Sequence, residues 1–247
     1  MSLIYVTSDL HGCSLDTLRS LLKKANFSPN DFLFILGDVI DRGEHGVELL
    51  QWMCEQSNVQ LILGNHEALL LSCEFLFDEI SEDSISTLDE EKMDLLSTWI
   101  SNGATPTLSK LQAMLKKFPD VLEGILDLLK DAPLFDVVEA NGVEYILVHS
   151  GLDNFSKMKG LDEYTSDELL WARPTMETEY YDDGRLVIFG HTPTGYFGKE
   201  HTNKMVKTKS WVCIDTGAAN GGMPMLLRID DMKEFYLDQD KELNIGG

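Results

Sequence analysis

The chain has 247 residues, enough for one large domain with a substantial hydrophobic core. Its 42 acidic and 20 basic residues give a net charge of -22. This charge argues against a nucleic-acid-binding surface, which needs Lys and Arg over the phosphates. The N-terminus lacks the pattern of a signal peptide, and no apolar stretch approaches the ~20 residues of a membrane span. We therefore expect a cytoplasmic protein that binds neither nucleic acid nor membrane.

The first 73 residues alternate strand and helix patterns. Apolar runs at 3–8, 32–36 and 59–63 are rich in β-branched and aromatic residues, which is typical of buried strands. Amphipathic patterns over 15–22 and 46–53 follow the first two runs. Such alternation predicts βαβ units with parallel strands.

Each of these runs leads into side chains suited to metal or phosphate binding. In chain order they are Asp9, His11, Asp38, Asp41, Arg42, Asn65 and His66. Functional groups of α/β sheets gather outside the carboxyl ends of strands, so we expect one shared site. If the backbone stays extended, Asp9 and His11 face the same side because they are two residues apart. Asn65 and His66 are adjacent and would then face different ways, which makes His66 a candidate proton donor.

Residues 74–132 carry a different pattern. Amphipathic stretches run over 88–100, 108–118 and 121–129, with Asp89 or Thr87 as a candidate cap of the first. We expect an all-helical insertion that covers one side of the site.

The second half of the chain is mainly β. Strand patterns at 134–138 and 143–148 flank Asn141-Gly142, a strong hairpin signal. Further strands are expected at 186–189, 205–208, 211–214, 225–229 and 235–237. The runs that end at residues 148 and 189 lead into His149 and His191. His45 and His201 follow no strand, and we interpret them as surface residues.

These ligands favour a particular class of metal. A single carboxylate such as Asp38 can bridge two hard divalent cations. Asn65, His149 and His191 would add a neutral oxygen and two nitrogens. Mixed imidazole and carboxylate ligation suits Mn²⁺, Fe or Zn²⁺ better than Ca²⁺.

At these residues the chain resembles the phosphoprotein phosphatase branch of the calcineurin-like metallophosphoesterases, in its small bacterial and phage form. The family pattern GDxHG, GDxxDRG, GNHE, HxG and GH stands here at residues 8–12, 37–43, 64–67, 149–151 and 190–192, with Ser8 in place of the first Gly. The resemblance implies an α/β (α+β) fold, a four-layer αββα sandwich. It implies one metallophosphoesterase domain over 1–247, with the helical insertion at about 74–132.

The resemblance also assigns the site. Metal one would be held by Asp9, His11 and Asp38, and metal two by Asp38, Asn65, His149 and His191. The same comparison makes Asp41 and His66 the acid dyad, and Arg42 and Arg173 the phosphate-binding residues. The cofactors would be two divalent ions, with Mn²⁺ as first choice and Fe or Zn²⁺ as alternatives. They would activate a water for attack on phosphorus.

The implied activity is that of a metal-dependent phosphomonoester hydrolase, first of all a serine/threonine protein phosphatase. Leu63 stands where most protein phosphatases have Arg, and the segment from Asp215 to Gly222 resembles a sister group. The alternative is therefore a symmetrical dinucleoside tetraphosphate hydrolase, or a broad phosphomonoesterase or phosphodiesterase. Asp41 and Glu67 follow the protein-phosphatase form.

A non-catalytic metal-binding adaptor would need none of Asp41, Arg42 and His66. We expect a monomer acting on a phosphorylated protein or a small phosphate ester.

Overall fold

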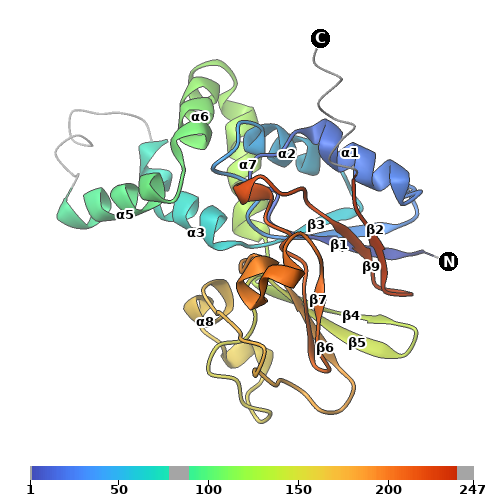
Figure 1. Cartoon of the computed structure of the whole chain (residues 1–247). Coiled ribbons are helices and arrows are strands. Elements are labelled where there is room, and N and C mark those ends of the chain that lie inside the picture. The colour runs from blue at the N-terminus through green and yellow to red at the C-terminus, as the bar shows by residue number, and fades with distance from the viewer. Residues whose placement is uncertain (1, 78–88, 238–247) are drawn as a thin grey trace.

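The computed structural model describes residues 2–77 and 89–237, and within them two five-stranded sheets pack face to face (Figure 1). The first sheet contains β1 (Ile4–Thr7), β2 (Phe32–Leu36), β3 (Val59–Ile62), β9 (Leu226–Arg228) and β10 (Lys233–Phe235), in the order β10-β9-β1-β2-β3. The second contains β4 (Phe135–Ala140), β5 (Val143–Val148), β6 (Leu186–Phe189), β7 (Val206–Lys207) and β8 (Trp211–Cys213), in the order β4-β5-β6-β8-β7.

Helices lie on both outer faces of this pair of sheets. The first sheet is covered by α1 (Leu15–Lys24), α2 (Gly46–Cys54) and α7 (Pro119–Asp131). Beside them lie α3 (Asn65–Ser72), η1 (Glu74–Leu76), α5 (Glu90–Ser101) and α6 (Thr105–Lys117). The second sheet is flanked by α8 (Ser166–Leu170) and η2 (Leu161–Glu163); η3 (Thr194–Phe197), η4 (Lys199–His201) and η5 (Ala218–Asn220) are short turns of 3₁₀ helix.

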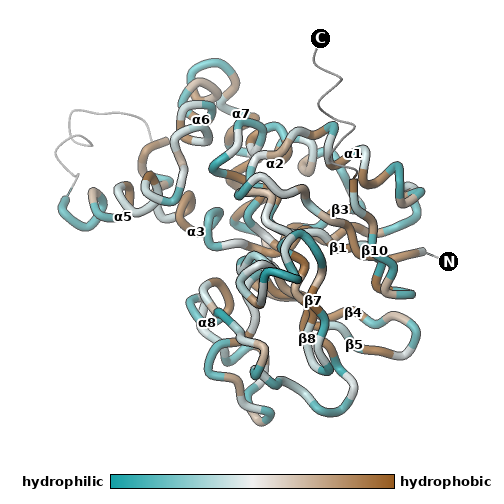
Figure 2. Tube along the Cα trace, viewed as in Figure 1, coloured by the Kyte–Doolittle hydropathy of each residue, from teal (hydrophilic) through white to brown (hydrophobic). Residues whose placement is uncertain are grey.

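Alternation of side chains along the strands creates the layers. In β1, Tyr5 packs against the helices and Val6 against the second sheet. In β5, Leu147 packs into the core between the sheets and Ile146 into the outer core. The central strands are correspondingly apolar along the trace in Figure 2. Both faces of each sheet are thus covered, which confirms the predicted αββα sandwich.

Most predicted elements are confirmed. β1, β2 and β3 pair in parallel, and β4 and β5 form the predicted antiparallel hairpin. At its turn Asn141 and Gly142 have φ of 51° and 76°, the left-handed values that a two-residue hairpin loop requires. Asp89 caps α5 by accepting the backbone N–H of Lys92, whereas Thr87 lies outside the described residues.

Expectations about local structure were wrong at the start of α3 and at the last strand. The segment at Asn65 and His66 is not extended, because both residues belong to the first turn of α3. The last strand lies two residues earlier than expected, at Lys233–Phe235. That the chain is one domain, with residues 74–132 as an insertion, stays a prediction. No helix in the described part of the chain has the length and apolar character needed to cross a lipid bilayer.

Candidate active site

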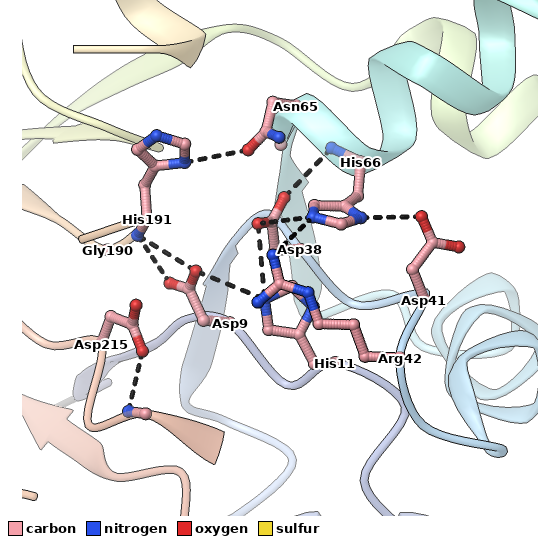
Figure 3. Close-up of polar contacts among 12 residues, drawn as sticks. Asp9, His11, Asp38, Asp41, Arg42, Asn65, His66, Gly190, His191 and Asp215 are labelled. Atoms are coloured by element: carbon pink, nitrogen blue, oxygen red, sulfur yellow. Dashed lines mark hydrogen bonds and ion pairs between the residues drawn. The ribbon is translucent and has the colours of Figure 1, made fainter. Parts of the chain in front are cut away.

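The site lies where the parallel strands of both sheets end. Asp9 and His11 follow β1, Asp38 follows β2, and Asn65 follows β3 across a short turn. From the second sheet, His149 follows β5, and His191 and Asp215 come shortly after β6 and β8. Figure 3 shows side chains from both sheets converging on one space around Asp38. Sequence positions more than 180 residues apart are therefore neighbours here.

The direction of many of these side chains is determined by left-handed backbone conformations and not by the alternation of a β-strand. Several non-glycine residues of the site have positive φ, a conformation that costs about 1–3 kcal/mol each. They are Asp9 (51°), His11 (41°), Asp38 (53°), Asp41 (68°), Arg42 (68°) and His191 (62°). β1 ends at Thr7, so the expectation that Asp9 and His11 continue an extended strand was wrong. Asp9 and His11 instead turn out of a tight loop after the strand.

The first group of candidate ligands surrounds the Nε2 atom of His11. Its Nδ1 lies 3.3 Å from the carbonyl oxygen of Ile40, which can only accept, so the proton sits on Nδ1. The lone pair of Nε2 then faces Asp9 Oδ1 at 3.9 Å and Asp38 Oδ2 at 3.6 Å. An imidazole nitrogen and two carboxylates this close together suit a cation between them. The ligand atoms of His11, Asp38 and His66 also lie within 4.8 Å of one another, so His66 borders the same position.

The second group of candidate ligands surrounds the Nε2 atom of His149. His149 Nδ1 lies 2.7 Å from the carbonyl oxygen of Leu36 and must donate to it. Its Nε2 therefore presents a lone pair to Asn65 Oδ1 at 2.8 Å and to Asp38 Oδ1 at 3.4 Å. His191 Nδ1 lies 2.9 Å from the same Asn65 oxygen. These contacts fit a divalent ion held by the four side chains, with Asp38 shared between both groups.

The charges of the buried groups also fit metal binding. Burial lowers the pKa of His11 and of His191 to about 3, so both imidazoles are neutral, the form that ligates metals. Burial, Asp215 and Asp38 raise the pKa of Asp9 well above its ordinary value. Closely spaced buried carboxylates are unfavourable without a cation, and bound divalent ions would remove that penalty.

Beside the candidate ligands lies a buried pair, His66 and Asp41. His66 Nδ1 is 2.7 Å from Asp41 Oδ2, and the guanidinium of Arg42 is 3.2 Å from His66 Nε2. Burial would lower the pKa of His66, but Asp38 and Asp41 outweigh it and raise that pKa. The imidazole also lies 3.8 Å from Asp38 Oδ2, next to the first ligand group. An imidazole and a guanidinium thus lie beside the first ligand group.

Glu67 has a role that the sequence reasoning did not assign. Its carboxylate accepts the backbone N–H groups of Asp38, Val39, Ile40 and Gly64. It thereby fixes the loop after β2 to the start of α3. Burial and Asp38 raise its pKa to about 7. Its position directly after the Gly-Asn-His motif was the available signal.

Asp215 follows β8, and Arg173 lies in the loop after α8. Asp215 is buried, accepts the N–H of Gly217 at 2.8 Å, and has a pKa raised by burial to about 7. Arg173 is exposed. Burial lowers the pKa values of His149 and His191, and the positive charge of Arg173 adds to this effect.

Gly190 leaves room for Asp9. A Cβ atom at this position would lie 1.9 Å from Asp9 Oδ2, and the Asp9 carboxylate accepts the N–H of His191 at 2.9 Å. Gly190→Ala is therefore expected to displace both side chains and to reduce bound metal and activity together, by about tenfold or more in rate. Metal analysis and initial rates would check this.

Gly124 provides a matched control because nothing lies within 4 Å of an added Cβ. It stands inside α7, so Gly124→Ala should leave metal content unchanged and stabilise the fold by about 0.5–1 kcal/mol. Normal metal content and turnover in Gly190→Ala would contradict the predicted clash.

Comparison with known proteins finds relatives that match nearly the whole chain. A bis(5'-nucleosyl)-tetraphosphatase (symmetrical) of Psychromonas ingrahamii is 26% identical over 274 aligned positions, which cover 94% of this chain and 95% of the relative. The enzyme of that name from Buchnera aphidicola is 23% identical and covers 96% and 98% of the two chains.

Solved structures share the fold. A candidate diadenosine tetraphosphatase superposes with a TM-score of 0.61 at 19% identity, over 94% of this chain and 91% of the other. A serine/threonine phosphatase from Saccharomyces cerevisiae gives 0.54 at 15%, over 98% and 82%. The profile of the calcineurin-like phosphoesterases matches residues 2–214. The chain therefore belongs to the calcineurin-like phosphoesterase family, whose members are hydrolases with a binuclear metal centre.

Proposed function

We propose that this protein is a symmetrical dinucleoside tetraphosphate hydrolase, which splits the central phosphoanhydride to release two nucleoside diphosphates. The observation that carries the proposal is the similarity along nearly the whole length of both chains to tetraphosphatases of that name. This reverses the order of preference from the sequence motifs, where a protein phosphatase came first. Both activities need the same metal-assisted attack on phosphorus, so the motifs alone favour neither.

The surroundings of the site support a nucleotide substrate. Leu63 supplies no guanidinium at the position where most protein phosphatases carry Arg. Its backbone N–H bonds to the carbonyl of Pro133, 2.9 Å away. Trp171 packs edge-on against His191, with ring centroids 5.8 Å apart, yet 41% of its surface is exposed. An exposed indole beside a phosphate site can stack on a nucleobase.

In the proposed mechanism each residue has a distinct task. Asp9, His11, Asp38, Asn65, His149 and His191 would hold two divalent ions, which supply an activated water and polarise the phosphoryl group. Arg42 and Arg173 would bind the phosphoryl oxygens and stabilise their growing charge. His66, oriented by Asp41, would give its Nε2 proton to the leaving phosphate oxygen. Arg42 can only donate to that same Nε2, so Nε2 must lose this contact and take up a proton before it can act as the acid.

The test is a substrate panel on metal-reconstituted protein. Diadenosine tetraphosphate, a phosphoserine peptide, an aryl phosphate and an aryl diester would be compared at equal concentration, with Mn²⁺, Fe²⁺ and Zn²⁺ in parallel. We expect kcat/KM at least about tenfold higher for the tetraphosphate, with ADP as sole nucleotide product. Preference for the phosphopeptide, or release of AMP with ATP, would contradict the proposal.

Trp171 provides a more specific prediction. Loss of one stacking contact costs about 1–3 kcal/mol, so Trp171→Ala should raise KM for diadenosine tetraphosphate by about 5- to 100-fold. The KM for the aryl phosphate, which lacks a nucleobase, should change little. Phe118→Ala removes another exposed aromatic, at the junction of α6 and α7, and should alter neither value. Equal effects on both substrates would rule out a nucleobase platform.

Serine/threonine protein phosphatase activity is the second candidate. The observation in its favour is Arg173 in a Trp-Ala-Arg segment like that of the phage and bacterial phosphatases, together with Glu67 after Asn65-His66. The same substrate panel decides between the two. A monomeric state, cytoplasmic location and Mn²⁺ as the native ion stay predictions.

A further inference from the structure

Helices α5 and α6 and the turn between them contact the candidate active site at three points, all on Asp41 and Arg42. The indole Nε1 of Trp99 donates to Asp41 Oδ2 at 2.9 Å. The backbone N–H of Asp41 donates to the hydroxyl of Thr107 at 3.0 Å, and that of Arg42 donates to the carbonyl of Gly103 at 2.9 Å. The helical segment thus holds the main chain and the side chain of the same loop.

That loop needs external support. Asp41 and Arg42 both have a φ of 68°, so two consecutive side-chain-bearing residues adopt the left-handed conformation. Gly103 packs directly under Arg42, since a Cβ there would lie 2.8 Å from Arg42 Cγ. Strained backbone of this kind persists only where surrounding contacts fix it.

Trp99 controls the orientation of the Asp41 carboxylate. Asp41 Oδ2 receives both the indole N–H and the imidazole N–H of His66, whereas Oδ1 has no hydrogen-bond partner among the described residues. Trp99 is fully buried, in contact with the core under α3 and α7. Without the indole donor, the carboxylate could rotate about its χ2 bond and release the imidazole.

We propose that Trp99 is a positioning residue, which acts through Asp41 to hold His66 in line with the leaving oxygen. The helical segment 90–117 would then be part of the catalytic apparatus rather than only a cover. The inference rests on the proposed role of His66 as proton donor and holds for either substrate class.

Trp99→Phe is the direct test, because it keeps an aromatic ring and removes the N–H group. Two phosphate monoesters separate positioning from folding: an alkyl phosphate, whose leaving oxygen needs a proton, and 2,4-dinitrophenyl phosphate, whose leaving oxygen does not. We expect kcat for the alkyl ester to fall about tenfold, part of the 10²–10⁴ that a general acid supplies. We expect less than about a twofold change for the activated ester, with KM and bound metal unaltered.

Two further variants complete the design. Trp52→Phe alters a half-buried tryptophan of α2 in the same core and should leave both rates unchanged. In an Asp41→Asn background Trp99→Phe should cause no additional loss, because the group that it positions is absent. If Trp99→Phe fails to fold, Thr107→Val removes a different contact to Asp41 and should produce the same split between esters.

Equal losses on both esters, a fall in bound metal, or no loss at all would overturn the proposal. Failure of the proposed function is a separate result, since it would appear in the wild-type protein as absence of tetraphosphate cleavage. The split between the two monoesters would remain in that case.

Discussion

Asp38→Asn is expected to remove most of the bound metal and to reduce turnover by about 10³-fold, because metal ions supply several kcal/mol of transition-state stabilisation. Asp38 is the side chain common to both ligand groups, with Oδ1 3.4 Å from His149 Nε2 and Oδ2 3.6 Å from His11 Nε2. The amide keeps the shape of the carboxylate but loses its charge and turns one acceptor into a donor. Neither group then retains its shared anionic ligand.

Metal content by atomic emission and rates with diadenosine tetraphosphate would be measured on the same samples. Asp131→Asn, an exposed residue at the end of α7, makes the same change in net charge and should retain full metal and activity. A variant at position 38 with wild-type metal content and turnover would show that the ions, if bound, lie elsewhere.

His66→Asn is expected to retain the metals and to lose about 10²–10⁴ in kcat on esters with poor leaving groups. The proposed ligand sets assign no metal to His66, which contacts Asp41 at Nδ1 and Arg42 at Nε2, although its ring lies beside His11 and Asp38. The loss should shrink as the pKa of the leaving group falls, since a better leaving oxygen needs less protonation in the transition state.

A series of aryl and alkyl phosphates would give the leaving-group dependence of kcat for both proteins. His201→Asn is the matched control, because His201 lies on η4 and pairs only weakly with Glu200 at 3.8 Å. A constant loss across the series, or a parallel loss of metal, would remove His66 from the proton-transfer step and make it a structural or metal-binding residue.

The positions of the strands were largely predictable because both sheets are buried on both faces. Short apolar runs marked β1, β2, β5 and β6 to within a residue or two, and Asn141-Gly142 marked the hairpin. The grouping of the candidate ligands also followed from sequence, since parallel strands bring their carboxyl ends to one edge. These features depend on local pattern and on a general rule of α/β topology.

The remaining features depend on contacts between distant segments. The left-handed loops at Asp9 and His11 carry no proline or glycine signal at those positions themselves, and so a continuing strand was expected. In the sequence, Trp99 occupies an ordinary apolar position of an amphipathic helix. Only tertiary packing brings its N–H to Asp41, which is 58 residues away. Helix α3 was missed because its apolar residues are nearly continuous and do not show a helical period.

The two sheets meet at the ligands, and this has a consequence for the stability of the protein. Asp38 and Asn65 follow strands of the first sheet, and His149 and His191 follow strands of the second. An ion bound by all four would therefore act as a removable cross-link between the two halves of the sandwich. Binding to the folded state alone adds about 2.7 kcal/mol at a free metal concentration 100 times Kd. The melting temperature should therefore rise with free metal and fall on chelation, and an unchanged value would exclude the cross-link. Resistance to unfolding would thus depend on metal supply as well as on sequence.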